Sequence, residues 1–275
     1  MTEPTKINLP PSMAQHHDLM LQNVRRTIAL DLTPISVRDD APIVAPPAES
    51  RVGGPAFVSD TWPWPATPDG KPMLHVAQLN LAELPQPEGF PSDGLLQFFV
   101  ANDGDYGMTW DNYPHNLASP NHRTVRYIPA ADLTDSASNP RAEGSLTTQV
   151  DSITDGYFTV TGQLCNQFLT FEDAEAVAIL ENHGVDIYSE DLEEFFYERD
   201  HPTTVFGGGW ASFTQNDPRD RPSEQMLLLQ LDTHVSSEHP VQMVWGDMGI
   251  ANFFITREDL ANLDFSNVLY TWDCG

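Results

Sequence analysis

The most sharply patterned part of the chain is the stretch 226–255, in which the apolar run MLLLQLD is followed by a loop and then by GIANFFI. An earlier stretch, 73–100, repeats this order with MLHVAQLNL, a loop rich in Pro and Gly, and GLLQFFV. Short apolar runs that are bounded by turn residues are typical of buried strands. We therefore predict strands at 73–81, 94–100, 227–232 and 249–255.

The two stretches share one register over a longer part of the chain. The spacing is 152 residues for Gln78 and Gln230, and 155 residues for Phe98 and Phe253, for Ala56 and Ala211, and for Trp110 and Phe265. A repeated unit with an apolar face usually packs against its own copy, and sites often form where two such units meet. These offsets predict two pseudo-symmetric halves, at about 50–130 and 205–275.

The N-terminal segment has the spacing of a helix. Ser12 is a good N-cap, and apolar side chains recur every three to four residues from Met13 to Ile28. The segment 39–50 is rich in Pro and predicts an extended linker. We interpret residues 1–49 as a helix and a Pro-rich linker that dock on a single domain at 50–275.

Two further helices are predicted between the halves. Thr170 can cap the first, with Asp173 as the acid of a capping box, and Ser189 can cap the second. The remaining patterns predict strands at 123–128, 157–160 and 267–273 and a short helix at 256–262. The sequence thus predicts an α+β protein of mostly antiparallel sheets, with two duplicated halves, a helical insert at about 150–204 and a seam at 132–148.

The charge balance narrows the range of partners. The chain has 40 Asp and Glu residues against 13 Lys and Arg residues, which gives a formal net charge of −27. Such a surface repels nucleic acid phosphates and anionic membranes, because binding to both depends on basic side chains. A basic protein, a cation or a neutral ligand remains as a partner. The alternative interpretation is that the charge serves solubility alone.

Cysteine use and the first residues indicate the compartment. The chain has two cysteines, Cys165 and Cys274, and its polar, Pro-rich N-terminus does not have the pattern of a signal peptide. No apolar run approaches the length of a membrane span. We therefore expect a cytoplasmic protein with reduced thiols.

Several specific strings then point to one family. They are SRVGGPAF, WPWP, LHVAQLNLAELP, GLLQFFV, GGGWASFTQNDPR, LLLQLD, MVWGDMGIANFFI and the ending DFSNVLYTWDC. With these strings in this order, the chain from about residue 50 to 275 resembles the YwqG-like family of bacterial proteins, although GGGW replaces an expected Gly-Tyr-Pro. The resemblance implies one α+β domain without an established activity or catalytic residues. Relatives near loci of the toxin–antitoxin type make an immunity or antitoxin-like role conceivable.

The usual chemical motifs do not match this sequence. GGGW lacks the Gly-Lys-Ser/Thr ending of a phosphate loop, and no serine lies in a Gly-x-Ser-x-Gly elbow. The nine histidines are scattered without HxH or HxxxH spacing, and Asp103, Asp105 and Asp111 depart from the spacing of an EF-hand. We therefore predict no cofactor and no metal.

Polar residues embedded in apolar strands and loops are the remaining candidates for a binding groove between the halves. They are Gln78, Trp210, Gln215, Asn216, Asp217, Arg219, Gln230, Trp245, Asp247 and Asn252. One interpretation is that they satisfy backbone groups at strand ends and turns. The other is an open groove lined by the two tryptophans, with MVWGD as the part in which the second copy differs most from the first.

Two functional hypotheses follow. The first, which we prefer, is a non-enzymatic cytoplasmic protein that binds a protein partner, such as a basic one, through its acidic surface or through the groove. The second is a hydrolase or metal-dependent enzyme in which Asp217 and Asp247 act as general acid and base. The position of Asp217 and Asp247 distinguishes the two hypotheses. The enzyme requires both carboxylates to face an open cleft, and a closed hydrogen-bond network would speak against it.

Overall fold

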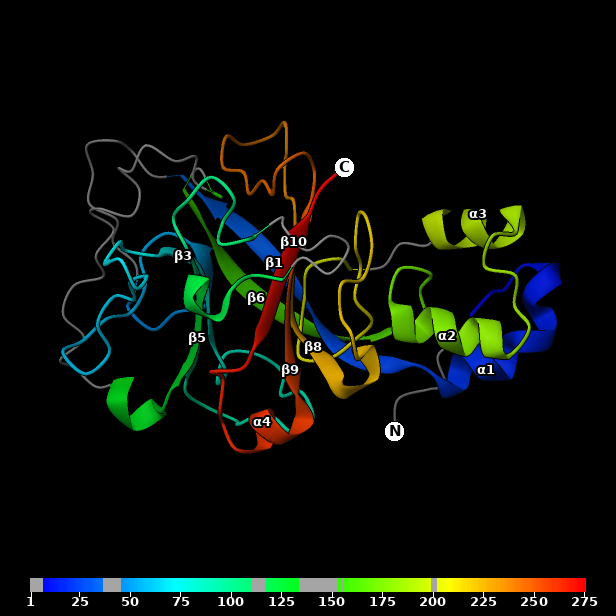
Figure 1. Cartoon of the computed structure of the whole chain (residues 1–275), viewed down its shortest axis with the longest axis horizontal. Coiled ribbons are helices and arrows are strands. Elements are labelled where there is room, and N and C mark those ends of the chain that lie inside the picture. The colour runs from blue at the N-terminus through cyan, green and yellow to red at the C-terminus, as the bar shows by residue number, and fades with distance from the viewer. Residues whose placement is uncertain (1–6, 37–45, 110–116, 134–152, 155, 199–201) are drawn as a thin grey trace.

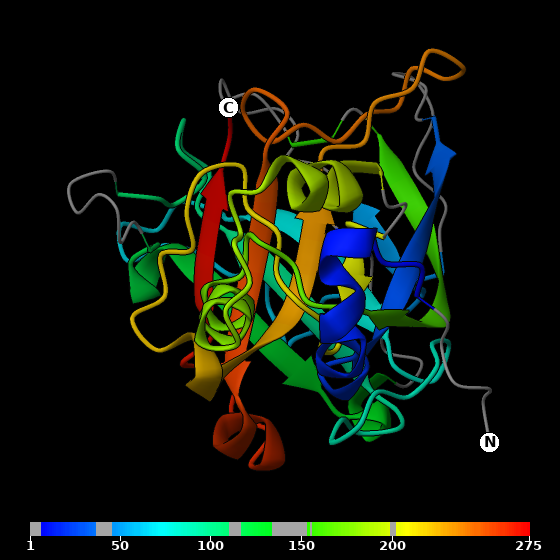
Figure 2. The same cartoon turned by 90° about the vertical axis from the view of Figure 1, so that its right-hand side faces the viewer.

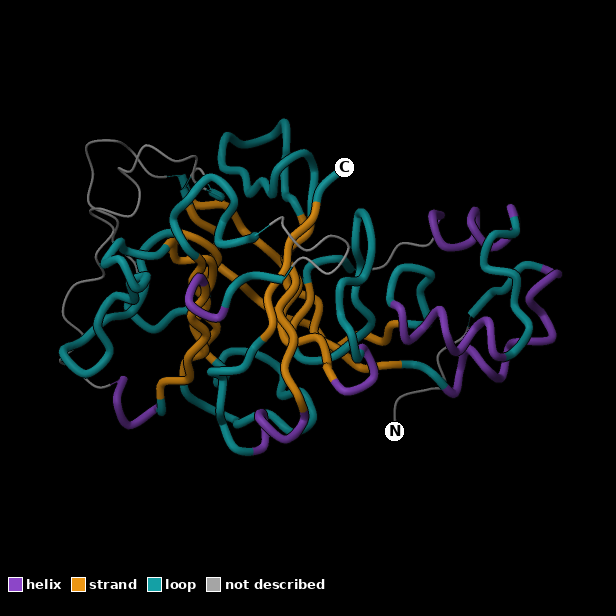
Figure 3. The backbone as a smooth tube through the Cα atoms, viewed as in Figure 1, coloured by secondary structure: helices purple, strands orange, loops and turns teal. Residues whose placement is uncertain are grey.

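The computed structural model describes residues 7–36, 46–109, 117–133, 153–154, 156–198 and 202–275. Within them, ten strands form one continuous sheet in the order β10-β9-β8-β7-β1-β6-β2-β3-β4-β5. All neighbouring strands are antiparallel. The strands, orange in Figure 3, make up the body of the molecule, and the helices α1, α2 and α3 lie toward one end of it.

The bounds of the elements are as follows. The strands are β1 (Arg25–Ile35), β2 (Arg51–Gly53), β3 (Leu74–Asn80), β4 (Leu95–Val100), β5 (Arg123–Ile128), β6 (Tyr157–Gln167), β7 (Val205–Phe206), β8 (Gln225–Asp232), β9 (Ile250–Thr256) and β10 (Leu269–Asp273). The α-helices are α1 (His17–Gln22), α2 (Ala174–Asn182), α3 (Glu190–Glu198) and α4 (Arg257–Ala261). Short 3-10 helices span Pro11–His16, Pro120–His122, Ala130–Leu133 and Pro222–Glu224.

The strand order reads the same outward from both sides of the central pair, β1 and β6. β2, β3, β4 and β5 follow on the side of β6, and β7, β8, β9 and β10 follow on the side of β1. The registers correspond as well, since Gln78 lies opposite Gln97 and Gln230 lies opposite Asn252. Both β3–β4 and β8–β9 also contain a bulge. The two blocks of four strands are therefore equivalent in order, register and irregularity.

The apolar faces of the two blocks pack directly on each other. Phe98 of β4 meets Phe253 of β9 edge to face, with the ring centroids 5.0 Å apart. Figure 1 shows β3 and β5 facing β8, β9 and β10, with β1 and β6 crossing between them. The opposite face of each block is covered by a loop, so that Phe99 and Phe254 are buried too. Burial on both faces explains why these strands read as continuous apolar runs.

The predicted α+β class, with helices between the halves, is wrong. The fold is mostly antiparallel sheet with few helices, and α1, α2 and α3 lie beyond one end of the sheet. Figure 2 views the molecule from that end, with these helices in front of the strands. They share a separate apolar cluster that includes Met20, Leu180 and Leu192. The helical stretch follows the first half in sequence, but the two halves cover each other and need no helical layer.

The predicted N-terminal helix is also shorter than expected. α1 ends at Gln22, and the chain enters β1 at Arg25, where Ile28 and Leu30 point into the core. The apolar residues 28, 30 and 32 alternate as in a strand, and Ile28 fits the helical spacing only by coincidence. Residues 1–49 thus contribute a central strand of the sheet.

From residue 134 on, the predicted seam at 132–148 lies outside the described residues. In the part of the chain that the structure describes, no helix has the length and apolar character needed to cross a membrane.

Candidate functional site

The polar residues predicted from the repeat hold the loops that cover the sheet. Gln78 Oε1 accepts a hydrogen bond from the backbone N–H of Phe57 at 2.8 Å, and Gln230 Oε1 accepts one from that of Ser212 at 2.8 Å. Gln78 and Gln230 are fully buried. Because each amide also donates to a backbone carbonyl, both side chains satisfy buried backbone groups.

A second amide completes the same arrangement in each half. Gln97 Nε2 donates to the carbonyl of Phe57 at 2.9 Å, and Asn252 Nδ2 donates to the carbonyl of Ser212 at 2.9 Å. The N–H and the C=O of one loop residue are thus held by two neighbouring strands. Asn252 is buried with Gln230 and does not face an open groove.

Asp217 and Arg219 belong to a buried ionic network. The Arg219 guanidinium donates to Asp217 Oδ2 at 2.6 Å and to Asp173 Oδ2 at 2.8 Å, and all three side chains are no more than 2% exposed. Burial lowers the pKa of Arg219, but hydrogen bonding to Asp217 and the charges of both carboxylates outweigh it and raise the pKa. The guanidinium lies 4.3 Å from the centre of the Phe254 ring. Both carboxylates are therefore committed to one cation.

Asp173 also begins α2. Its Oδ1 accepts hydrogen bonds from the N–H groups of Glu175 and Ala176, which makes Asp173 the N-cap. The predicted cap, Thr170, instead accepts a hydrogen bond from the N–H of Asp173. The network thereby fixes the start of α2 to the loop that follows Trp210.

The remaining predicted residues lie apart from this network. The backbone N–H of Gln215 donates to Asp273 Oδ2 at 2.7 Å, and burial raises the pKa of Asp273. Trp245 is fully buried against the ring of Tyr106, while Asn216 and Asp247 are exposed. Asp217 is buried and ion-paired whereas Asp247 is exposed, so no shared cleft supports their assignment as an acid and base pair.

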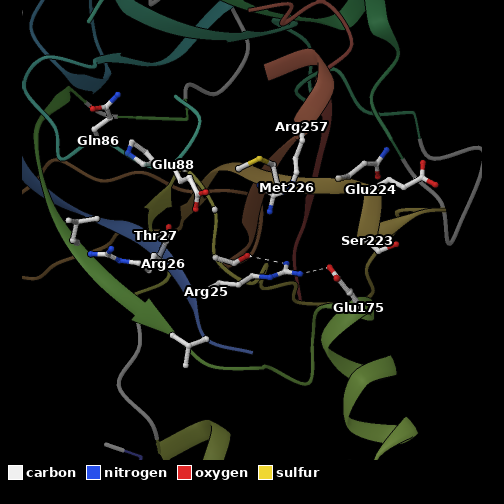
Figure 4. A pocket seen from close by; sticks show the side chains of 17 residues that line it. Arg25, Arg26, Thr27, Gln86, Glu88, Glu175, Ser223, Glu224, Met226 and Arg257 are labelled. Atoms are coloured by element: carbon white, nitrogen blue, oxygen red, sulfur yellow. Dashed lines mark hydrogen bonds and ion pairs between the residues drawn. The ribbon is translucent and has the colours of Figure 1, made fainter. Parts of the chain in front are cut away.

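A cleft of about 660 Å³ lies elsewhere, at the junction of the two halves. The first half contributes Gln86, Pro87 and Glu88, and the second half contributes the Gly207–Gly209 turn, the start of β8 and Arg257 of α4. The start of β1, together with Leu164 and Glu175, lines the remaining walls (Figure 4). None of the ten residues predicted from the sequence is among its lining residues.

The three successive glycines form one wall of the cleft. Their φ angles are +74°, +105° and +94°, a region that other residues rarely adopt. A Cβ on Gly207 would lie 2.4 Å from Pro87, and one on Gly209 would lie 2.2 Å from Gln167 Oε1. Glycine is therefore required for the chain to pass this close to Pro87 of the first half and to Gln167 of β6.

Arg25 is fixed in the cleft by three contacts. Its guanidinium carbon lies 3.4 Å from the centre of the Trp210 ring. Its terminal nitrogens donate to Glu175 Oε2 at 2.6 Å and to the carbonyl of Gly209 at 3.5 Å, as the dashed lines in Figure 4 mark. Trp210 is itself held by Asn23 and Gln167. The arginine is thus preorganised before any ligand binds.

The charge of the cleft differs from that of the whole protein. Arg25, Arg26 and Arg257 line it together with Glu88, Glu175 and Glu224. A chain of net charge −27 thus has a formally neutral cleft that contains three of its 13 basic residues. Such a region can bind an anionic group that the rest of the surface would repel.

The lining of the cleft provides charged and hydrogen-bonding side chains. Its lining within the described residues includes Arg, Glu, Gln, Ser and Thr side chains but no His, Cys or Asp. Across the described chain, no group of three or more His, Cys, Asp or Glu side chains is placed to hold a metal ion. Asp103 accepts hydrogen bonds from backbone groups within its own loop, and Asp111 lies outside the described residues.

The fold and the cleft together define an antiparallel sheet protein with two equivalent blocks of four strands and a charged cleft at their junction. The chain belongs to the family described as a domain of unknown function (DUF1963), which matches residues 50–274. No curated protein matches the chain. The expected YwqG-like name is not confirmed by any named relative.

Proposed function

We propose that the protein is a non-enzymatic, cytoplasmic binding protein that engages a protein partner through the cleft between its halves. The observation that carries this proposal is the position and lining of the cleft. Both halves contribute to it, and a preorganised arginine lies within it. Preformed clefts at the junction of two structural units are common binding sites.

The net charge supports a neutral or basic partner. A formal charge of −27 attracts positively charged proteins and speeds their encounter, and it repels acidic ones. The cleft then supplies short-range contacts that the acidic surface alone does not provide. An immunity-like or antitoxin-like role, in which the protein neutralises a basic partner, fits this combination.

The contacts of Asp217 argue against its role as a general base. Asp217 is held by Arg219 and also accepts a hydrogen bond from the N–H of Ala174 at 3.0 Å. A general base needs a lone pair that can reach the substrate. A carboxylate in this position serves the packing of α2 instead.

A retention experiment with matched variants tests the proposal. The full chain is immobilised and exposed to extract of its native host at low salt, alongside Arg257→Gln and Lys71→Gln. Arg257 lines the cleft, and Lys71 is an exposed cation outside its lining, so both changes remove one positive charge. We expect one protein to be retained by the wild type and by Lys71→Gln but lost from Arg257→Gln.

Two outcomes contradict the proposal. Equal retention by all three proteins would place the interaction on another surface. Failure of the wild type to retain any protein at low salt would remove the case for a protein partner. Thermal unfolding of both variants should match the wild type, because Arg257 and Lys71 are exposed.

A further inference from the structure

We infer that the cleft recognises a single carboxylate on a peptide segment of the partner. This inference rests on the proposed function and specifies the chemistry of the group that enters the cleft. It follows from the charges that remain after internal ion pairs are assigned, from one buried acceptor atom, and from the net charge of the chain.

The uncommitted charge in the cleft is one positive unit. Arg25 is paired with Glu175, and the charge of Glu224 is balanced by that of Arg221, which lies 3.3 Å away outside the lining. Arg26, Arg257 and Glu88 have no ion pair within the described part of the chain. Two arginines against one glutamate leave an excess of one positive charge, which one carboxylate would neutralise.

Arginine and carboxylate also match in geometry. A guanidinium donates two parallel hydrogen bonds to a carboxylate, and it is less strongly hydrated than an ammonium group. Arg26 and Arg257 are exposed and free to adopt such a pairing. A phosphate monoester carries a charge of about −1.5 to −2 at neutral pH, which exceeds the one positive charge left uncommitted in the cleft. The cleft therefore suits a carboxylate better than a phosphate.

A buried acceptor indicates that the carboxylate is part of a peptide. Gln225 lines the cleft, and its Oε1 is buried without a hydrogen bond among the described residues. An unpaired buried acceptor costs free energy, which a rotation of the Gln225 side chain toward a donor in the cleft would recover. A peptide provides amide N–H donors beside its carboxylate, whereas a free carboxylate ion provides none. Leu164, which is 49% exposed, and Met226 provide apolar contact for the same segment.

The net charge of the chain restricts the rest of the segment. Charges within about 8–10 Å of an approaching group act on it at ordinary ionic strength, and most charges on this protein are negative. A small free anion is therefore repelled before it enters. A carboxylate flanked by basic residues is attracted at long range and is then paired with Arg257 at short range. The recognised segment thus combines one acidic and several basic residues.

Model peptides test this inference directly. The probes are Lys-Ala-Ala-X-Ala-Ala-Lys peptides with blocked C-termini and an uncharged fluorophore at the N-terminus, in which X is Glu, Gln or phosphoserine. Fluorescence anisotropy at low salt gives Kd for each peptide with the full chain. We expect the Glu peptide to bind at least about tenfold more tightly than the Gln peptide. The phosphoserine peptide should bind no more tightly than the Glu peptide.

Matched variants locate the effect. The preference for Glu should fall to less than about twofold in the double variant Arg26→Gln/Arg257→Gln and should persist in Lys71→Gln. The inference is overturned if the wild type shows no preference for Glu, whether both peptides bind equally or neither binds. It is overturned equally by a preference that survives the double variant, or by tighter binding of phosphoserine.

The two proposals can fail separately. If Arg257→Gln loses a host protein in the retention experiment while the Glu and Gln peptides bind alike, the binding function stands and the carboxylate chemistry is wrong. If the peptides behave as expected but no host protein depends on Arg257, the cleft recognises the group and the proposed partner interaction is wrong.

Discussion

Gln78 and Gln230 lie 152 residues apart in the chain and make the same hydrogen bond. Each is fully buried, and each accepts from the backbone N–H of a loop residue at 2.8 Å. In each half the strand holds the loop that covers its outer face. The polar residues that interrupt the apolar strands are thus the attachment points of these loops.

We expect Gln230→Leu to destabilise the protein. The substitution leaves the N–H of Ser212 and the carbonyl of Thr203 without their present partner, and each unpaired buried group costs about 1–3 kcal/mol. Urea unfolding measures the loss. Gln163→Leu is the control, because Gln163 is exposed and bonds only at the surface, and it should change stability by about 0.5 kcal/mol or less. Equal effects of the two changes would contradict a structural role for Gln230.

Arg219→Met should be among the most damaging single substitutions. It leaves Asp173 and Asp217 buried at 1–2% exposure without a counter-ion, which costs about 3–5 kcal/mol. Chemical unfolding followed by circular dichroism measures this loss, and α2 should lose helical signal first because Asp173 caps it. Arg221→Met is the matched control, since Arg221 is 72% exposed and its pair is worth little. A stability close to the wild type in Arg219→Met would refute this account.

The buried His75 should make the folded protein less stable in mild acid. Burial, followed by the charge of Arg51, lowers the pKa of His75 to about 3 from its ordinary value of about 6.5. The native ring stays neutral, and the unfolded chain binds one more proton between these two values. Unfolding free energy should therefore be highest above pH 6.5 and should fall below it, by at most about 1.4 kcal/mol per pH unit from this residue.

Substitution isolates the contribution of His75. Between pH 6.5 and 5 few carboxylates titrate, so the slope of stability against pH in His75→Phe should be flatter than in the wild type. His183→Phe, which replaces an exposed histidine, is the comparison variant. If His75→Phe retained the full slope, another group would have to be responsible.

The need for glycine beside the cleft can be tested by comparing Gly209 with Gly184, which also has a positive φ but lies in open space. Gly209→Ala and Gly184→Ala both place a side chain at positive φ, which costs about 1 kcal/mol. Only the first also drives a Cβ into Gln167 Oε1, the acceptor of the Trp210 N–H, because Gly184 has open space. Gly209→Ala should therefore lower the unfolding free energy by clearly more than Gly184→Ala. Equal losses would show that the close approach is not required.

The repeat was predictable because the two copies kept the same polar residues at the same strand positions. Gln78 and Gln230 stand out in apolar runs at a spacing of 152 residues, and the other three pairs set the common register of 155 residues. What the residues do was open, because a buried hydrogen-bond anchor and a groove residue have the same sequence signature. The 2.8 Å hydrogen bonds that Gln78 and Gln230 accept from the N–H groups of Phe57 and Ser212 identify both side chains as anchors of a loop.

The cleft was not predictable, because it is assembled from short pieces that lie far apart in the chain. Arg25, Glu88 and Arg257 are unremarkable charged residues in sequence and meet only in the folded protein. The sequence did contain one signal for this region, the string GGGW, because consecutive glycines indicate that the backbone passes close to other atoms. The prediction of an α+β fold failed for a related reason. Helices that lie between two halves in the sequence need not lie between them in space.

The symmetry of the sheet bears on how many partner molecules one chain can bind. Gly208 and Gly209 border the cleft, but their counterparts in the first half, Gly53 and Gly54, pack against the side chains of Thr154 and Tyr157. Within the described residues, these glycine positions are therefore packed in the first half and border the cleft in the second. One chain should hold one partner molecule, and native mass spectrometry of the complex should give a one-to-one mass rather than the two-to-one mass that a twofold molecule would allow.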